Sequence, residues 1–299
     1  MDFTIRKYLN LLNTLKSHDF SLVPVGEFEQ TRSGRVLVIR QDVDLLPQNA
    51  LGFAEIQASN GIRSTFYFRA VSKSFNEEII SKIAEMGHEI GYHYEDLSLW
   101  HRAWGMGHGK INEAEWCRLG IDSFTKNLDR LRTLVPVKTI CMHGSPLCPR
   151  DSRLLWKYYD YRELGIMSEP YFDIDFSNML YLTDTGRRWD GTSVSVRDKG
   201  LVIQTEDLNE DYYKDWVVKP IKGSLMRMTQ EGLDFQKAYV HRLTDEIIMA
   251  AKEGSFAQRA MITFHPQRWT DRMGPWAKEL VWQNLKNLAK YYMVKWDSY

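Results

Sequence analysis

The chain has 299 residues, and its 39 Lys and Arg balance its 39 Asp and Glu, so the formal net charge is zero. Nucleic-acid-binding proteins usually carry an excess of positive charge, so this balance argues against that class. Hydrophobic residues make up 43% of the chain and charged residues 26%, which excludes a disordered protein and is typical of a globular one. The length fits one large α/β domain.

The three cysteines, Cys117, Cys141 and Cys148, are too few and odd in number for a disulfide framework. We therefore expect reduced thiols and a cytoplasmic protein. Residues 1–30 are expected to form an N-terminal helical extension, because their apolar residues recur at helical spacing without the core of a signal peptide. No apolar run is long enough to span a bilayer, so we expect no membrane partner.

Short apolar runs alternate with helical stretches along the chain. Strands are predicted at 36–44, 64–70, 89–94, 139–144 and 260–265. Helices are predicted at 49–60, 75–88, 112–134 and 241–253, with a Trp-, His- and Gly-rich loop at 96–110 and an irregular insertion region at about 160–240. A last helix, 275–293, is predicted to turn its apolar residues inward, namely Ala277, Val281, Leu285, Leu288 and Tyr292.

This alternation predicts a parallel sheet wound with helices, in one domain with insertions. Four of the predicted strands end in Asp or His: Asp42 and Asp44, His93, His143 and His265. In closed (β/α) barrels, residues at the carboxyl ends of the strands converge on one mouth. We therefore expect these side chains to lie close together.

Two carboxylates at one strand end need a cation or a proton to balance their charge. A divalent metal held by one of Asp42 and Asp44 and by imidazoles from other strands would leave an open position for water. A His on the opposite rim would protonate the leaving group. The alternative is that the two acids form a helix cap or a solvated turn. His88 is interpreted as structural, since it lies roughly 16 Å from His93 along an extended chain.

At these positions the sequence resembles the polysaccharide deacetylase superfamily, carbohydrate esterases that include the nodulation-type chitooligosaccharide deacetylases. The resemblance rests on QDVD (41–44), STFYF (64–68), GHEIGYH (87–93) and ITFH (262–265). It implies a distorted (β/α) barrel of seven or eight parallel strands, as a single domain over residues 1–299. It also implies a divalent metal, Zn²⁺ or a similar ion, and removal of N- or O-acetyl groups from sugars.

The resemblance implies a role for each matching residue. Asp42 and Asp44 match the family's acidic pair, and we favour Asp42 as the base and Asp44 as a metal ligand. The family's acids are adjacent, whereas Val43 separates them here. His93 matches the first His of the metal motif, and His265 matches the late His that acts as the acid.

The second His of the metal motif should lie four residues after His93, but Leu97 is at that position. His143, Glu95 or Asp96 could replace it, and we expect His143 to complete the metal site. In the family, the place of His143 is usually taken by an Arg that orients the base.

The resemblance therefore predicts a metal-dependent hydrolase that removes an acetyl group from a sugar or glycan, in polysaccharide biosynthesis or modification. One alternative is a degenerate, inactive relative that binds a glycan or acts as a scaffold, which the replacement of the second His by Leu97 favours. Another is a different metal-dependent amide hydrolase on the same barrel.

Aromatic and Arg side chains near the predicted mouth favour a carbohydrate substrate, since Trp faces pack on sugar rings and guanidinium groups bind acidic groups. These residues suggest an acidic or nucleotide-linked sugar, and the alternative is that they form salt bridges and core contacts. The candidate substrate-binding residues are Trp100, Trp104, Arg188, Trp189, Arg268 and Trp269.

Overall fold

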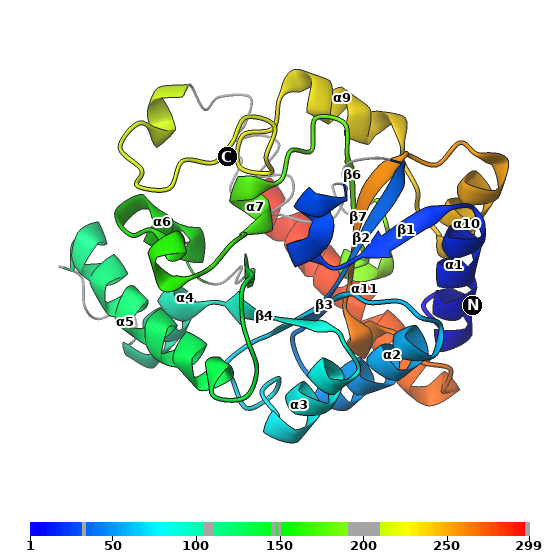
Figure 1. The fold of residues 1–299 in the computed structure, drawn as a ribbon, viewed down its shortest axis with the longest axis horizontal. Helices are drawn as coiled ribbons and strands as arrows, with labels where there is room; N and C mark the ends of the chain where they lie inside the picture. Colours follow the sequence, from blue (N-terminus) through cyan, green and yellow to red (C-terminus); the bar gives the residue numbers. More distant parts are fainter. Residues whose placement is uncertain (32–33, 105–110, 145–147, 149–150, 191–209, 297–299) are drawn as a thin grey trace.

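The computed structural model describes residues 1–31, 34–104, 111–144, 148, 151–190 and 210–296. Its centre is one seven-stranded sheet in which all paired strands run parallel (Figure 1). The strands are β1 (Phe20–Val23), β2 (Arg35–Val43), β3 (Thr65–Phe68), β4 (Glu89–Tyr94), β5 (Ile140–Met142), β6 (Leu180–Thr183) and β7 (Arg259–Phe264).

The strand order is β5-β4-β3-β2-β7-β6, and β1 pairs with the first half of β2. The sheet curls into a half-barrel, and within the described residues no pairing joins β5 to β6. The predicted distorted barrel of parallel strands is thus confirmed, with seven strands among the described residues. Each of the five strands predicted between residues 36 and 265 is present.

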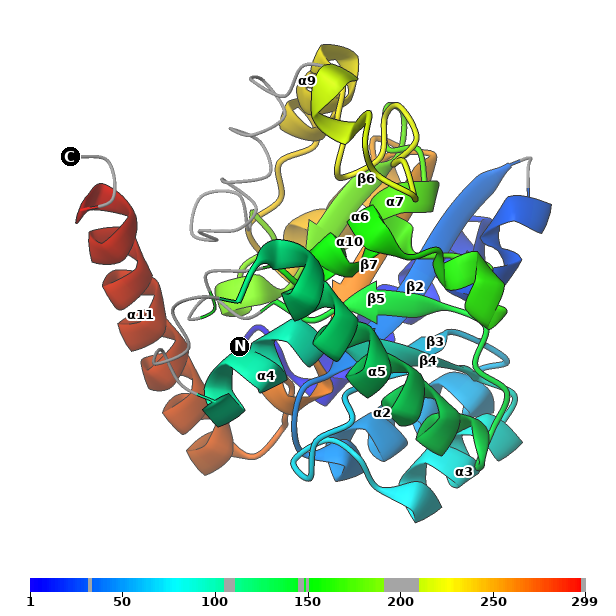
Figure 2. The same ribbon diagram turned by 90° about the vertical axis from the view of Figure 1, so that its left-hand side faces the viewer.

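Helices surround the sheet (Figures 1 and 2). The α-helices are α1 (Ile5–Ser17), α2 (Pro47–Ser59), α3 (Glu77–Glu85), α4 (Asp96–Trp104), α5 (Glu113–Arg132), α6 (Leu155–Tyr158), α7 (Pro170–Asp173), α9 (Gln230–Ala238), α10 (Thr244–Glu253) and α11 (Met273–Trp296). The 3-10 helices are η1 (Val25–Gln30), η2 (Ser152–Leu154), η3 (Tyr161–Leu164), η4 (Thr185–Arg187), η6 (Glu210–Tyr213) and η7 (Pro266–Arg268). No helix within these residues is both long and apolar enough to cross a membrane.

The N-terminal residues are more than a helical extension. The helix α1 is present as predicted, and it buries an apolar face on its own domain, including Tyr8, Leu11 and Leu15. Residues 20–23, however, form the strand β1, which belongs to the central sheet. The predicted loop at 96–110 is also partly wrong, because residues 96–104 form α4.

The last helix does not pack as its pattern predicts. Val281 and Leu285, predicted to point inward, are 59% and 55% exposed. The side chains of Leu288 and Tyr292 lie outside the described residues. Near the start of α11, Trp276 donates to the carbonyl of Asp2. Figure 2 shows the helix along the side of the molecule. The periodicity of α11 predicts an apolar stripe, but it does not predict whether another element of the fold packs on that stripe.

The inner face of the half-barrel explains one glycine of the GHEIGYH segment. A Cβ at Gly91 would collide with the ring of Tyr67 and lie 3.0 Å from the carbonyl of Thr139. The Tyr67 ring is buried there, its hydroxyl 3.2 Å from Oγ1 of Thr139, and the Arg40 guanidinium lies over it at 5.6 Å. Only a residue without a side chain lets the Tyr67 ring lie across this strand.

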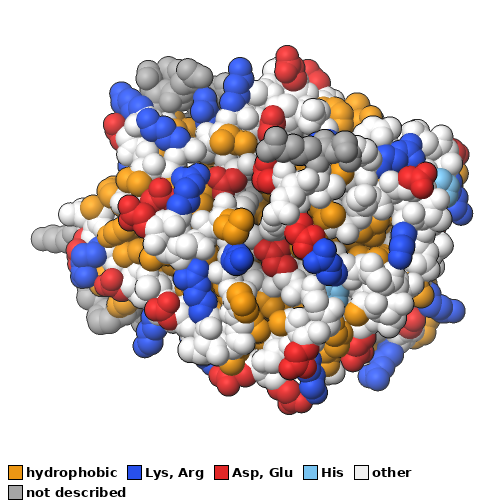
Figure 3. All heavy atoms as spheres, in the orientation of Figure 1, with side chains coloured by type: hydrophobic (Ala, Val, Ile, Leu, Met, Phe, Trp, Pro, Cys, Tyr) orange, Lys and Arg blue, Asp and Glu red, His pale blue; other side chains and the backbone are white. Residues whose placement is uncertain are grey.

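Charges of both signs are interspersed over the face shown in Figure 3, as the zero net charge leads one to expect. None of the three cysteines, all of which the structure describes, forms a disulfide; Cys117 and Cys141 are buried and Cys148 is half-buried.

Candidate metal centre and active site

The structure brings together five side chains predicted from the sequence. Asp42 lies in β2 with Asp44 just after it, and His93 lies in β4. His143 directly follows β5, and His265 directly follows β7. Because all the strands run parallel, these positions share the carboxyl edge of the sheet.

Asp44, His93 and His143 form the core of this site, with ligand atoms all within 4.8 Å of one another. The Nε2 atoms of His93 and His143 lie 3.6 and 3.4 Å from Oδ1 of Asp44. Two ligands of one tetrahedral zinc ion, with bonds of about 2.0–2.2 Å, lie about 3.4 Å apart. Oδ1 of Asp44 is buried and has no hydrogen-bond partner among the described residues. The three residues therefore fit a divalent ion.

Contacts on the far sides of both imidazoles orient them. Nδ1–H of His93 donates to the main-chain carbonyl of Cys141 at 2.8 Å, which leaves Nε2 facing Asp44. Nδ1 of His143 lies 3.2 Å from Oε2 of Glu95. A second contact of this kind fixes the ring and leaves the other nitrogen for a metal.

Neighbouring charges set the protonation of the three residues. Burial opposes ionisation of Asp44, but His143, His93 and His265 outweigh it and hold the pKa of this carboxyl well below its usual range. Burial lowers the pKa of His143, which favours the neutral ring that a metal ligand needs. Burial also acts to lower the pKa of His93, but Asp42 and Asp44 raise it overall. His93 is thus the ligand from which a bound ion would displace a proton.

Asp42 is held by an arginine that sequence reasoning missed. Nη2 of Arg40 donates to Oδ2 of Asp42 at 3.0 Å, and both side chains are buried. The same Oδ2 lies 3.7 Å from Nε2 of His93. The family resemblance implies an Arg beside this acid at the position of His143, whereas here the Arg that contacts Asp42 is Arg40. Its position was open to prediction, because residues two apart on a strand point to the same face.

His265 is held by a buried aspartate that was also missed. Asp184, just after β6, is fully buried. Its Oδ1 accepts from Nδ1 of His265 at 2.5 Å and from Nη1 of Arg268 at 2.8 Å. Its Oδ2 accepts from Nε1 of Trp269 at 2.7 Å and from the main-chain N–H of His265 at 2.9 Å. Burial opposes ionisation of Asp184, but His265 and Arg268 outweigh it and lower the pKa of its carboxyl.

This arrangement turns Nε2 of His265 toward the site, 3.8 Å from Oδ2 of Asp44. The sequence signal for Asp184 is its place at the end of the short apolar run 179–184, which contains β6. This signal is weak, because the run lies inside the irregular region predicted at about 160–240.

The residues near the expected second metal-motif His divide into three roles. Leu97 is fully buried and packs against Gly120 of α5. Asp96 accepts hydrogen bonds from Tyr92, Ser123 and Asn127 and stays outside the metal group. Glu95 forms ion pairs with two arginines.

His88, as expected of a structural residue, is buried, with Nε2 3.1 Å from the carbonyl of Ala54.

Most of the predicted substrate-binding residues are buried or form ion pairs within the protein. Trp189 and Trp269 are 2% and 1% exposed, so the prediction that their faces meet a sugar is wrong. Both pack around Phe3 in the core. The guanidinium of Arg268 pairs with Asp184.

The remaining candidates are Arg188, Trp100 and Trp104. Arg188 pairs with Asp190, so neither this arginine nor Arg268 presents a free guanidinium to an acidic sugar. Trp100 is half-buried on α4, and the side chain of Trp104 lies outside the described residues.

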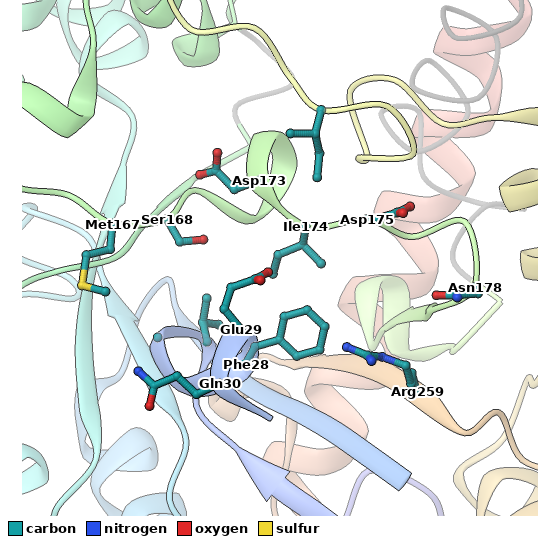
Figure 4. A pocket seen from close by; sticks show the side chains of 13 residues that line it. Phe28, Glu29, Gln30, Met167, Ser168, Asp173, Ile174, Asp175, Asn178 and Arg259 are labelled. Atoms are coloured by element: carbon teal, nitrogen blue, oxygen red, sulfur yellow. The ribbon is translucent and has the colours of Figure 1, made fainter. Parts of the chain in front are cut away.

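A separate pocket of about 550 Å³ lies at the other end of the sheet (Figure 4). Phe28 and Glu29 of η1 line one side and Asp173 and Ile174 the other. It reaches Arg259, the first residue of β7, whereas the candidate site lies beyond the last residue of that strand. None of the five site residues lines this pocket.

No family model matches the chain, and no curated protein matches it. Among solved structures, it is similar to a family 4 carbohydrate esterase from Bacillus anthracis, with 12% identity, a TM-score of 0.33, and coverage of 83% of this chain and 88% of the other. It is also similar to the family 4 carbohydrate esterase PdaA from Bacillus subtilis, with 11% identity, a TM-score of 0.32, and coverage of 85% and 86%.

A third similar structure is a wild-type pseudoenzyme of the same family (CE4) from Bacillus anthracis, with 13% identity, a TM-score of 0.33, and coverage of 76% and 63%. These structures represent the carbohydrate esterases that the sequence resembles. At such identities and TM-scores they carry no argument about activity, so the functional argument rests on the residues of the site.

Proposed function

We propose that this protein is a metal-dependent hydrolase that removes an acetyl group from a sugar or glycan during polysaccharide biosynthesis or modification. One observation carries the proposal. Asp44, His93 and His143 present three metal-competent atoms, with the Arg40-bound carboxylate of Asp42 beside them and the Asp184-bound imidazole of His265 across from Asp44.

In the proposed site, Asp44, His93 and His143 would hold a divalent ion of the zinc type, which would supply Lewis-acid polarisation of the acyl carbonyl. Asp42 accepts the proton of the attacking water, and its ion pair with Arg40 fixes the position of the carboxylate. His265 donates a proton from Nε2 to the departing amine or alcohol, while Asp184 fixes the opposite nitrogen.

The proposed substrate is an acylated carbohydrate. Arg188 and Arg268 pair within the protein, so these two guanidinium groups are not offered to an acidic sugar. The lack of a disulfide among the three cysteines supports the proposed cytoplasmic location.

The Asp42→Asn variant tests the assignment of the base. Asn keeps the shape of the side chain but cannot take a proton, so acetate release from N- and O-acetylated sugars should fall by about 10²–10⁴-fold. The exposed Asp245, which pairs with Lys7, supplies the matched control Asp245→Asn, which should keep full activity. Wild-type activity in Asp42→Asn would contradict the role of Asp42, and activity unaffected by a chelator would contradict the metal.

The degenerate, glycan-binding alternative is favoured by the burial of Leu97, which leaves the family's second His position without a ligand. It predicts a chain that binds acetylated glycans without releasing acetate at any Zn²⁺ concentration. Release of an acyl group from amides other than sugar amides would instead favour the second alternative, an amide hydrolase on the same barrel.

A further inference from the structure

Glu95 is a buried carboxylate next to the metal group whose two oxygens are already engaged. It directly follows β4, two residues after His93, and is 1% exposed. Nε of Arg69 donates to Oε1 at 2.6 Å, and Nη2 of Arg102 donates to Oε2. With a guanidinium on each oxygen, Glu95 is not a metal ligand, although the sequence left that possibility open.

Glu95 directly contacts His143, one of the three candidate metal ligands. Oε2 of Glu95 lies 3.2 Å from Nδ1 of His143, on the far side of the ring from Asp44. The ring is not turned to give a full hydrogen bond at this distance.

Glu95 also acts on a second candidate ligand, Asp44, through Arg69. The guanidinium of Arg69 pairs with Glu95 and also donates from Nη1 to the main-chain carbonyl of Asp44 at 3.0 Å. The main-chain N–H of Arg69 donates to Oγ of Ser74, whose hydroxyl in turn donates to the carbonyl of Val43. Arg69 therefore fixes the backbone that carries Asp44 and ties it to Glu95.

We propose that Glu95 is a positioning residue that holds two of the three metal ligands in place, His143 by direct contact and Asp44 through Arg69. This inference rests on the metal site of the proposed function. Its physical basis is general, since carboxylates behind metal-binding imidazoles fix the ring and raise metal affinity.

The test measures metal binding rather than turnover. Zn²⁺ affinity is determined by chelator competition for the wild type, Glu95→Gln, and the matched control Glu27→Gln. Glu27 forms a bidentate pair with Arg63 near the amino end of β3, away from the site. Glu95→Gln should bind Zn²⁺ about 10–100-fold more weakly, whereas Glu27→Gln should bind like the wild type.

Two further readouts separate positioning from a general loss of structure. The visible absorption spectrum of the Co²⁺-loaded protein should change in Glu95→Gln and not in Glu27→Gln, because it reports the ligand geometry. If Glu95→Gln does not fold, Arg69→Met serves instead. It leaves the Glu95–Arg102 pair intact but frees the carbonyl of Asp44, and it should also weaken Zn²⁺ binding.

Equal Zn²⁺ affinity and an unchanged Co²⁺ spectrum in the variant would overturn the role of Glu95 and leave the proposed function standing. A wild-type chain that binds neither Zn²⁺ nor Co²⁺ would overturn both.

Discussion

The Asp184→Asn variant tests the carboxylate that accepts four hydrogen bonds beside the site. Four donors surround the two oxygens of Asp184, namely Nδ1 and the main-chain N–H of His265, Nη1 of Arg268 and Nε1 of Trp269. An amide offers one oxygen, so its NH₂ group must face two of these donors in a place that water does not reach.

The expected cost follows from these contacts. Each buried donor left without an acceptor costs about 1–3 kcal/mol, and the loss of a buried charge partner costs about 3–5 kcal/mol. Arg268 enters both costs, once as a donor and once as a charge partner, so the two costs do not add in full. We therefore expect the free energy of unfolding to fall by about 3–5 kcal/mol. A domain with a stability of about 5–15 kcal/mol can stay folded after such a loss.

Urea unfolding measures this change, with Asp190→Asn as the control. Asp190 pairs with Arg188 at a partly exposed position, where an ion pair contributes about 1 kcal/mol or less. In the folded Asp184→Asn protein, kcat should also fall, by up to about 10⁴-fold where a carboxylate sets the imidazole tautomer. A stability loss below about 1 kcal/mol, equal to that of the control, would refute this account of Asp184.

Two other predictions concern the barrel interior. Gly91→Ala should lower the free energy of unfolding by about 1–3 kcal/mol, because the new methyl group collides with the Tyr67 ring. The control Gly52→Ala, where a Cβ meets nothing within 4 Å in α2, should be neutral or stabilising by up to about 1 kcal/mol. Equal effects in chemical denaturation would contradict the steric argument. Burial raises the pKa of Glu169 to about 7, against the hydrogen bonds from the N–H groups of Met142 and Tyr171. The folded state therefore holds a proton that the unfolded state releases, and about 3 kcal/mol of stability present below pH 4.5 is lost as the pH rises through 7. The drop in stability between pH 5 and pH 8 should be smaller in Glu169→Gln, and an identical drop would rule out this carboxyl as its source.

The sequence predicted the sheet and the core of the site because both depend on local pattern. Runs such as residues 36–44 alternate with amphipathic helices, which predicts a parallel sheet. In a parallel sheet the strand ends share one edge, so Asp44, His93 and His143 could be expected to meet. The structure places their ligand atoms within 4.8 Å of one another.

The partners of the site residues were harder to predict, because they depend on which way a side chain points and on what lies opposite it. Trp269 follows a strand end as His265 does, yet it turns into the core and donates to Asp184. Arg40 shares a face with Asp42, which period-two alternation predicts, but its pairing depends on the buried surroundings. In α11, the pattern predicts a stripe that includes Val281 but not whether anything covers it.

The central claim is that Asp44, His93 and His143 bind a catalytic divalent ion. Anomalous X-ray diffraction from crystals grown with Zn²⁺ tests it most directly. We predict one ion at the carboxyl edge of the sheet, bonded to a carboxylate oxygen of Asp44 and to Nε2 of both histidines at about 2.0–2.2 Å. Crystals with no ion at these three residues, or with zinc held by other side chains, would contradict the claim.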